Sequence, residues 1–163
     1  MLYDIPGRTG TKIDVGTLIR LALHPRIAAV KDAKGDFFAS SQVMLASDLA
    51  FYSGDDALNL PWLSVGAVGF VSVVGHVVGA QLADMIGRHR AGDVRGALEL
   101  HRRLLPVVAG IMTRTQGAIM VKAALDLIGQ QGGPLRLPLV EATEQEFAVL
   151  RADLVAGGVK LTD

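Results

Sequence analysis

Short apolar runs alternate with helical stripes through the first part of the chain, and this alternation limits the folds that it can adopt. Four runs have the composition of buried strands, at residues 2–5, 27–30, 49–52 and 69–74. Between them, apolar residues recur at helical spacing, as at Val15, Leu18 and Ile19. Strands separated by helices pair in parallel, because each helix carries the chain back to the end of the sheet from which the next strand starts. The sequence therefore predicts an α/β fold with a parallel sheet.

Aspartates precede three of the helical stripes, where a side-chain oxygen can accept a hydrogen bond from the free N–H groups of a first helical turn. Asp14 and Asp36 stand before the first two stripes, and the pair Asp55 and Asp56 stands before the third. The remaining helices are expected at residues 77–88, 93–111, 116–127 and 141–155. From Asp93 onward the pattern is helical only.

The length of 163 residues bounds the architecture. A closed eight-stranded α/β barrel usually needs about 250 residues. We therefore expect half a barrel in residues 1–91, followed by a helical domain in residues 92–163. An open doubly wound sheet of four strands is the alternative. The first strand-to-helix turn lacks its G-x-G-x-x-G fingerprint, and the sequence has no P-loop pattern.

Composition argues against several classes of function. The sequence has 16 basic and 16 acidic side chains and no basic stretch, so nucleic-acid binding is not expected. It has no cysteine, which excludes thiolate metal sites, disulfides and a thiol nucleophile. No metal site is expected, because the spacing of the histidines matches no ligand motif; they are His24, His76, His89 and His101.

Targeting and membrane signals are weak. Residues 1–10 have neither a basic segment nor an apolar segment of a signal peptide. Residues 57–83 carry no acidic or basic side chain and are long enough to span a bilayer. Pro61, Gly66 and Gly69 interrupt this stretch, however, and favour helix, turn, strand, turn and helix. We expect a cytoplasmic protein that does not contact a membrane.

Catalytic residues of parallel α/β proteins are concentrated at the carboxyl ends of the strands. The candidates there are Tyr3, Lys31, residues 53–56 and Ser72. Lys31 follows an apolar run, where a low dielectric would favour the neutral amine that attacks a ketone to form a Schiff base. The alternative is a lysine that leaves the strand and extends to water. Tyr3 can relay a proton or be an amphipathic residue at the edge of the core.

Two further sites are ambiguous from the residues alone. Arg8 lies between Gly7 and Gly10, in a turn where its planar guanidinium can bind a carboxylate, although a solvated loop arginine fits as well. Asp55 and Asp56 can form a carboxylate pair for acid–base chemistry or cap a helix. The spacing does not decide between these alternatives.

Several motifs together carry a resemblance to a known family. They are YDIPGRTG at 3–10, VKDAKGD at 30–36, YSGDDA at 52–57 and GFVSV at 69–73. In this order and spacing they resemble the dihydrodipicolinate synthase family of pyruvate-dependent class I aldolases. The resemblance extends to RLPL at 136–139 and covers the second part of a normal family member. It implies strands five to eight of an eight-stranded α/β barrel, followed by C-terminal helices.

The resemblance also implies roles for individual residues. Lys31 resembles the lysine that forms an imine with pyruvate, and Tyr3 resembles the tyrosine that passes protons during imine and enamine formation. Arg8 resembles the arginine that holds the carboxylate of the second substrate. Residues that resemble parts of the pocket wall are Gly54, Asp55 and Val71. Asp4 departs from the asparagine found in many family members, which leaves the catalytic assignment unchanged.

The implied reaction is the condensation of pyruvate with L-aspartate 4-semialdehyde, a step in diaminopimelate and lysine biosynthesis. It needs no metal or organic cofactor, because the imine itself is the electron sink. The family usually forms homotetramers. Its threonine pair and a second tyrosine that reaches across the dimer interface belong to the first half of the barrel, so we expect a fragment with little activity alone.

Two alternatives remain. Another pyruvate aldolase, such as N-acetylneuraminate lyase or a 2-keto-3-deoxy sugar acid aldolase, would share the lysine and the tyrosine. Arg8 argues against these branches, which generally lack an arginine at its position. The second alternative is a catalytically silent fragment or subunit. A reduced pyruvate adduct on Lys31 would distinguish it from a working site.

Overall fold

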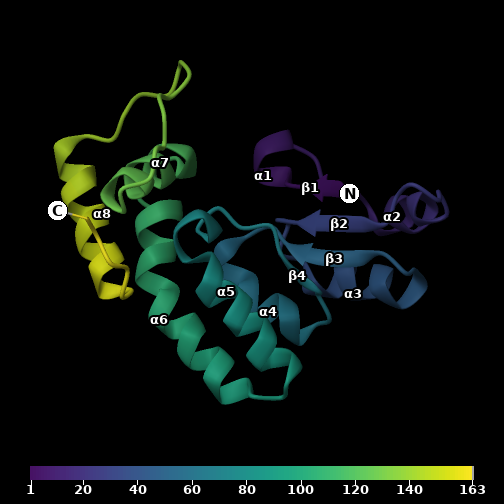
Figure 1. Cartoon of the computed structure of the whole chain (residues 1–163). Helices are drawn as coiled ribbons and strands as arrows, with labels where there is room; N and C mark the ends of the chain where they lie inside the picture. Colours follow the sequence, from purple (N-terminus) through teal and green to yellow (C-terminus); the bar gives the residue numbers. More distant parts are fainter. Residues whose placement is uncertain (163) are drawn as a thin grey trace. The chain divides into compact units, whose positions relative to one another are not determined.

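The computed structural model describes residues 1–162, and the chain divides into two compact units. The first unit is Met1–Ser72, and the second begins at Val73. The elements of the first unit are β1 (Leu2–Asp4), α1 (Pro6–Thr9), α2 (Val15–Ala22), β2 (Ala29–Asp32), α3 (Phe37–Ala46), β3 (Ala50–Ser53), the short 3₁₀ helix η1 (Asp56–Leu58), α4 (Asn59–Ser64) and β4 (Gly69–Phe70) (Figure 1). The predicted alternation of strands and helices is thus confirmed.

The strands form one parallel sheet in the order β1-β2-β3-β4, as the alternation predicted. The fourth strand is shorter than expected, because it covers Gly69–Phe70 instead of residues 69–74. Its partner β3 ends at Ser53, which is paired with Phe70. One more backbone bond follows, from Val71 N–H to the carbonyl of Ser53, at 2.8 Å. Residues after Val71 have no partner in β3, because β3 ends at Ser53.

The two faces of the sheet have different surroundings. Side chains alternate between the faces, and residues in register share a face. One face packs against the helices: its core cluster includes Val30 and Phe51 from the strands with Leu18, Val43 and Trp62 from α2, α3 and α4. Tyr3, Lys31 and Tyr52 are in register on the other face and are less buried. This second face carries Tyr3 and Lys31, the two residues predicted to be catalytic.

The expected aspartate caps are confirmed in two of three places. Asp36 accepts a hydrogen bond from Ala39 N–H at 3.0 Å, and Asp55 accepts one from Ala57 N–H at 3.0 Å. Asp14 was expected to cap α2 with its side chain, and this prediction is wrong. Its side chain makes no cap bond, and it contributes its backbone carbonyl to Leu18 N–H instead.

The second unit consists of helices. They are α5 (Gly75–Arg90), α6 (Val94–Met112), α7 (Gly117–Leu127) and α8 (Glu144–Ala156). The last one begins three residues later than expected, because Thr143 and Glu146 form a reciprocal capping box that fixes its first turn. Among residues 1–162, no single helix is long and apolar enough to cross a membrane; α6 and α7 together have the length and composition but are bent by 115°.

Candidate active site

The structure brings Lys31 and Tyr3 together. They lie opposite each other on β2 and β1, and the Lys31 ammonium nitrogen is 4.0 Å from the centroid of the Tyr3 ring. An ammonium over the face of an aromatic ring is held by the ring quadrupole. Tyr3 is 44% exposed, so the pair is accessible to a small molecule from solvent. Lys31 is therefore fixed in direction while it remains within reach of a ligand.

Gly54 determines where the stem of Lys31 can lie. A Cβ atom at Gly54 would stand 2.9 Å from both Cγ and Cε of Lys31 and 3.1 Å from the carbonyl oxygen of Asp32. The N–H of Gly54 donates to that same carbonyl at 2.7 Å, so the two backbones are already in close contact. A glycine is needed at this position for the lysine stem to pass.

The other candidate residues lie in loops at the same edge of the sheet. Arg8 is exposed on α1, the four-residue turn that follows β1, and Gly10 ends this turn with a φ of 75°. Asp55 caps η1, so its carboxylate has a structural partner in Ala57 N–H. Val71 is 37% exposed and continues the pairing of β4 with β3. Within residues 1–162 the neighbours that the structure places against the Lys31 side chain are Tyr3 and Gly54, and the roles of these three loop residues toward a substrate remain predictions.

Asp56 is more deeply buried than its neighbour and joins two loops. It accepts hydrogen bonds from the amide of Asn59, at 3.1 Å, and from the hydroxyl of Ser72, which follows β4. Asp56 is 4% exposed. The carboxylates of Asp55 and Asp56 thus have different partners, a cap and a loop-to-loop bridge. The acid–base pair considered from the sequence gains no support from this arrangement.

Sequence reasoning missed a charged cluster behind the candidate site. Asp4 and Asp32 follow Tyr3 and Lys31 directly and are buried on the helix-covered face, where Lys34 lies between them. Asp4, noted above as a departure from the family's asparagine, therefore has a cationic partner in this chain. The signal was present in the second lysine of VKDAKGD, but only the fold brings it to β1.

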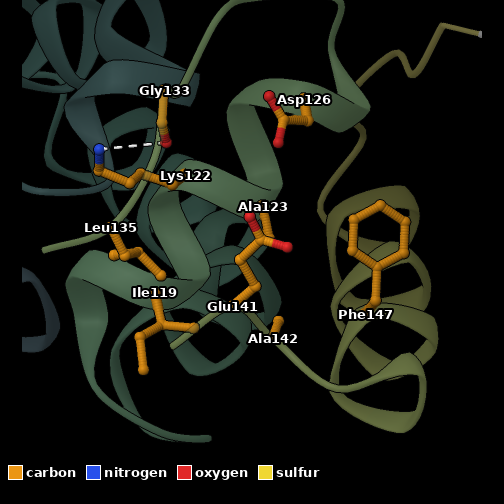
Figure 2. A pocket seen from close by; sticks show the side chains of 9 residues that line it. All are labelled: Ile119, Lys122, Ala123, Asp126, Gly133, Leu135, Glu141, Ala142 and Phe147. Carbon is orange, nitrogen blue, oxygen red and sulfur yellow. Dashed lines mark hydrogen bonds between the residues drawn. The ribbon is translucent and has the colours of Figure 1, made fainter. Parts of the chain in front are cut away.

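A hollow in the second unit, of about 150 Å³, lies between α7, the loop after it and α8 (Figure 2). It contains another lysine, Lys122. The ammonium of Lys122 donates to three backbone carbonyls, of Gly132, Gly133 and Pro134, at 2.8 to 3.2 Å. All three of its protons are engaged in holding the loop, so this lysine is not placed to attack a ketone.

No group of three or more potential metal ligands from His, Asp and Glu lies together within residues 1–162. The arrangement on the first unit is instead that of an accessible amine beside a phenol, at the carboxyl edge of a parallel sheet. A model of one protein family matches residues 1–156, and its description is the dihydrodipicolinate synthetase family. The chain belongs to this family.

Curated relatives carry the same function name. The chain is 60% identical over 161 residues to 4-hydroxy-tetrahydrodipicolinate synthase 2 of Streptomyces coelicolor, a match that covers 99% of this chain and 54% of that protein. It is 60% identical over 158 residues to the 4-hydroxy-tetrahydrodipicolinate synthase of Acidothermus cellulolyticus, covering 97% of this chain and 51% of that protein. The chain thus spans about half the length of the curated relatives that it matches.

Solved structures of the family share the fold. The dihydrodipicolinate synthase of Cyanidioschyzon merolae with lysine bound superposes with a TM-score of 0.92 at 39% identity, over 98% of this chain and 55% of that one. The enzyme of Aquifex aeolicus gives 0.91 at 30% identity, over 99% and 56%. The α/β fold of this chain is therefore similar to that of dihydrodipicolinate synthases, as the motifs predicted.

Proposed function

We propose that this chain carries the imine-forming part of a 4-hydroxy-tetrahydrodipicolinate synthase, which condenses pyruvate with L-aspartate 4-semialdehyde. One observation supports this above all: the Lys31 ammonium lies 4.0 Å from the Tyr3 ring on adjacent parallel strands, in a chain of the dihydrodipicolinate synthetase family. Residues 1–91 would correspond to strands five to eight of the barrel, and residues 92–163 to the C-terminal helical domain. A cytoplasmic location and a homotetrameric whole protein belong to the same proposal.

In this mechanism the neutral amine of Lys31 attacks the carbonyl carbon of pyruvate. The carbonyl oxygen leaves as water, and an imine links Lys31 to the former keto carbon. Loss of a proton from the methyl group gives an enamine, whose carbon attacks the aldehyde of the second substrate. The substrate's own amine then attacks the imine carbon, closes the ring and releases Lys31.

The surrounding residues would serve this chemistry in distinct ways. Tyr3 would pass protons to and from the oxygens that leave or form, since a hydroxyl can both donate and accept. Arg8 would bind the carboxylate of L-aspartate 4-semialdehyde with its planar guanidinium. Gly54 leaves room for the Lys31 stem, and Asp55 and Val71 would complete the wall of the pocket. No organic cofactor is required by these steps.

Borohydride trapping tests the proposal. The 163-residue chain is incubated with pyruvate and borohydride, and the modified residue is located by peptide mass spectrometry. We expect a reduced adduct on Lys31 in the wild type and none on this residue in Lys31→Arg, because a guanidinium is not a nucleophile at neutral pH. Lys12→Arg, a change at an exposed lysine, serves as the matched control and should leave the adduct unchanged.

A folded wild-type chain without an adduct on Lys31 would overturn the proposal. Addition of L-aspartate 4-semialdehyde before borohydride tests the second half of the reaction. We expect it to lower the amount of trapped pyruvate adduct, since the enamine is consumed. An adduct that forms but does not respond to the aldehyde would contradict the choice of second substrate.

A further inference from the structure

Two buried carboxylates lie directly behind the candidate site. Asp4 and Asp32 follow Tyr3 and Lys31 in the sequence and are in register with each other across β1 and β2. Successive side chains of a strand point to opposite faces, so these carboxylates are on the helix-covered face. They are 1% and 0% exposed. Each carboxylate thus belongs to the residue that directly follows Tyr3 or Lys31 at the end of its strand.

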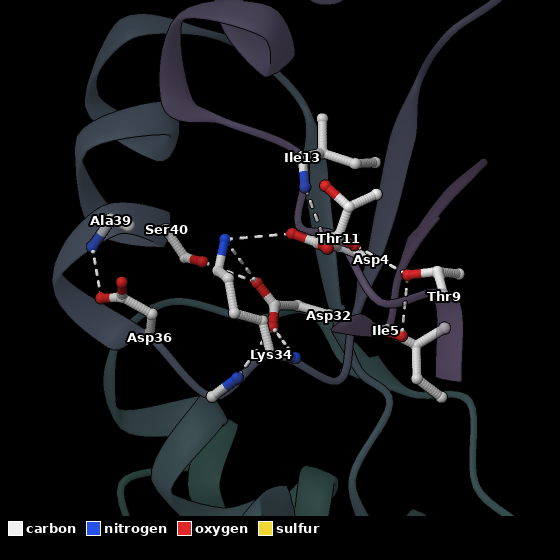
Figure 3. Close-up of polar contacts among 11 residues, drawn as sticks. Asp4, Ile5, Thr9, Thr11, Ile13, Asp32, Lys34, Asp36, Ala39 and Ser40 are labelled. Carbon is white, nitrogen blue, oxygen red and sulfur yellow. Dashed lines mark hydrogen bonds and ion pairs between the residues drawn. The ribbon is translucent and has the colours of Figure 1, made fainter. Parts of the chain in front are cut away.

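Lys34 lies between the two carboxylates (Figure 3). Its ammonium nitrogen is 3.1 Å from Oδ2 of Asp4 and 3.7 Å from Oδ2 of Asp32, and its side chain is 7% exposed. The carboxylates also accept hydrogen bonds from four further donors: the N–H groups of Ile13, Lys34 and Gly35 and the hydroxyl of Ser40. Two carboxylates thus share one ammonium in a place with little access to water.

We propose that Lys34 is a positioning residue for the imine chemistry of Lys31. Through Asp4 and Asp32 it joins the ends of β1 and β2, and so sets the position of Tyr3 relative to Lys31. It also balances part of the negative charge that lies behind the reactive amine. The inference rests on the function proposed above, because it concerns the reactivity of Lys31.

The energetics of buried ion pairs explain why the loss of Lys34 should affect Lys31. Removing one partner of such a pair is far more damaging than removing both, because it leaves an uncompensated charge in a low dielectric. Without the Lys34 ammonium, the carboxylates of Asp4 and Asp32 repel each other at the ends of the two strands. Their charge then also favours the ammonium form of Lys31, which cannot attack a ketone.

Other charged or titratable groups around Lys31 do not provide this balance. Tyr3 and Tyr52 face it from β1 and β3, and a phenol side chain brings no cation that could balance the two carboxylates. A cavity of about 50 Å³ beside Lys34 is lined by Lys12, Asp14 and Asp36, whose side chains belong to exposed residues and are screened by water. Lys12→Met therefore makes the same change of charge as Lys34→Met, at the edge of the same cavity but in solvent.

The test compares the wild-type chain with Lys34→Met, Asp4→Asn, the double variant Asp4→Asn/Lys34→Met and the control Lys12→Met. The first measurement is the rate at which pyruvate and borohydride modify Lys31 at saturating pyruvate, expressed per folded molecule. The second is competitive acetylation by trace acetic anhydride, which reports by peptide mass spectrometry how fast the Lys31 amine reacts at each pH. The second measurement does not depend on pyruvate.

We expect Lys34→Met to slow imine trapping about tenfold and to move the acetylation profile of Lys31 by about one pH unit toward higher pH. Asp4→Asn should move the profile in the opposite direction. The double variant has the same formal cluster charge as the wild type, −1, and should return the profile and most of the rate. Lys12→Met should resemble the wild type.

The outcomes separate this inference from a purely structural role. If Lys34→Met keeps the wild-type rate and profile, or if the double variant is as impaired as Lys34→Met, the inference is wrong. If Lys34→Met does not fold, the opposite shift in Asp4→Asn and the wild-type profile of the double variant decide the matter. A wild-type chain that forms no adduct overturns the proposed function, while the acetylation profiles still test Lys34.

Discussion

The two units of the chain bury different kinds of side chain. Among residues 1–162, the buried polar and charged side chains all lie in the first unit: Asp4, Asp32, Ser40, Ser53, Asp56 and Asn59. The second unit buries apolar side chains, such as Ile111, Met120 and Leu150. Ion pairs such as Arg88 with Asp84 and Arg95 with Glu99 lie at the surface of this unit.

This difference distinguishes the unit that holds the proposed site from a unit whose core is apolar. A buried polar group costs about 1–3 kcal/mol when it loses its partner, so a cluster of them requires many fixed contacts. In the first unit five of these groups lie at or shortly after the carboxyl ends of β1 to β3, and the sixth, Ser40 on α3, donates a hydrogen bond to Asp32 at the end of β2. The residues proposed to bind and convert substrate lie at the same strand ends. The apolar core of the second unit needs no hydrogen-bond partners for its side chains. The comparison can be tested by substitutions that change stability without changing the reactivity of Lys31, or the reverse.

The largest expected effect is on the stability of the second unit. Leu150 on α8 is fully buried, and Leu150→Ala should lower the free energy of unfolding by about 3 kcal/mol through lost burial and a cavity. Urea unfolding measures this loss. Val155→Ala, at a position on the same helix that is 59% exposed, is the control and should change stability little. The trapping rate at Lys31 per folded molecule should stay at the wild-type value, and a parallel fall in that rate would contradict the separation.

The second effect is on the chemistry of the first unit. In Gly54→Ala the new Cβ would displace the Lys31 stem, from which it would otherwise be 2.9 Å. We expect imine trapping to slow about a hundredfold, because a misplacement of about 1 Å at a reacting group has that order of effect. Gly16→Ala on α2 is the matched control, since a Cβ there meets nothing within 4 Å.

The two glycine variants are compared at equal folded fraction, which near-UV circular dichroism and the fluorescence of the buried Trp62 report. A wild-type trapping rate in Gly54→Ala would show that the lysine stem adapts without loss. A loss of rate in Gly16→Ala as well would show that the unit responds to any added methyl group. Either result would remove Gly54 from the set of residues that position Lys31.

Much of the first unit follows from local sequence, and its charged cluster does not. Apolar runs located all four strands, and their carboxyl ends located Tyr3 and Lys31, because both signals depend on neighbours along the chain. The contact of Lys34 with Asp4 joins residues thirty positions apart, so it exists only once β1 pairs with β2. The clearance at Gly54 likewise depends on the register of β3 with β2.

The short fourth strand is a second feature that local sequence does not predict. Residues 69–74 have a strand composition throughout, but a strand needs a partner as well as a propensity. The partner strand β3 ends at Ser53, which is in register with Phe70 of β4. The pairing therefore stops at the next residue, Val71, whose N–H donates to the carbonyl of Ser53. Helix boundaries at the start of α8 were also decided by a pair of side chains, Thr143 and Glu146, that a search for apolar periodicity does not weigh.

The smallest expected effect is on the pH dependence of the second unit. Backbone and side-chain hydrogen bonds from Thr143 hold the pKa of Glu146 below its ordinary value. A carboxylate whose pKa is lowered by folding stabilises the folded state at pH values above its unfolded pKa, and this contribution is lost as the pH falls through the folded pKa. Glu146→Gln keeps an acceptor for the capping box but carries no charge at any pH, so it should lack the part of the stability that the carboxylate adds at neutral pH and, with it, that part of the acid-induced loss. Glu144→Gln removes the same charge from the same first turn and is the control. Urea midpoints measured from neutral to acid pH provide the test, and equal acid slopes for the two variants would show that the capping box does not contribute.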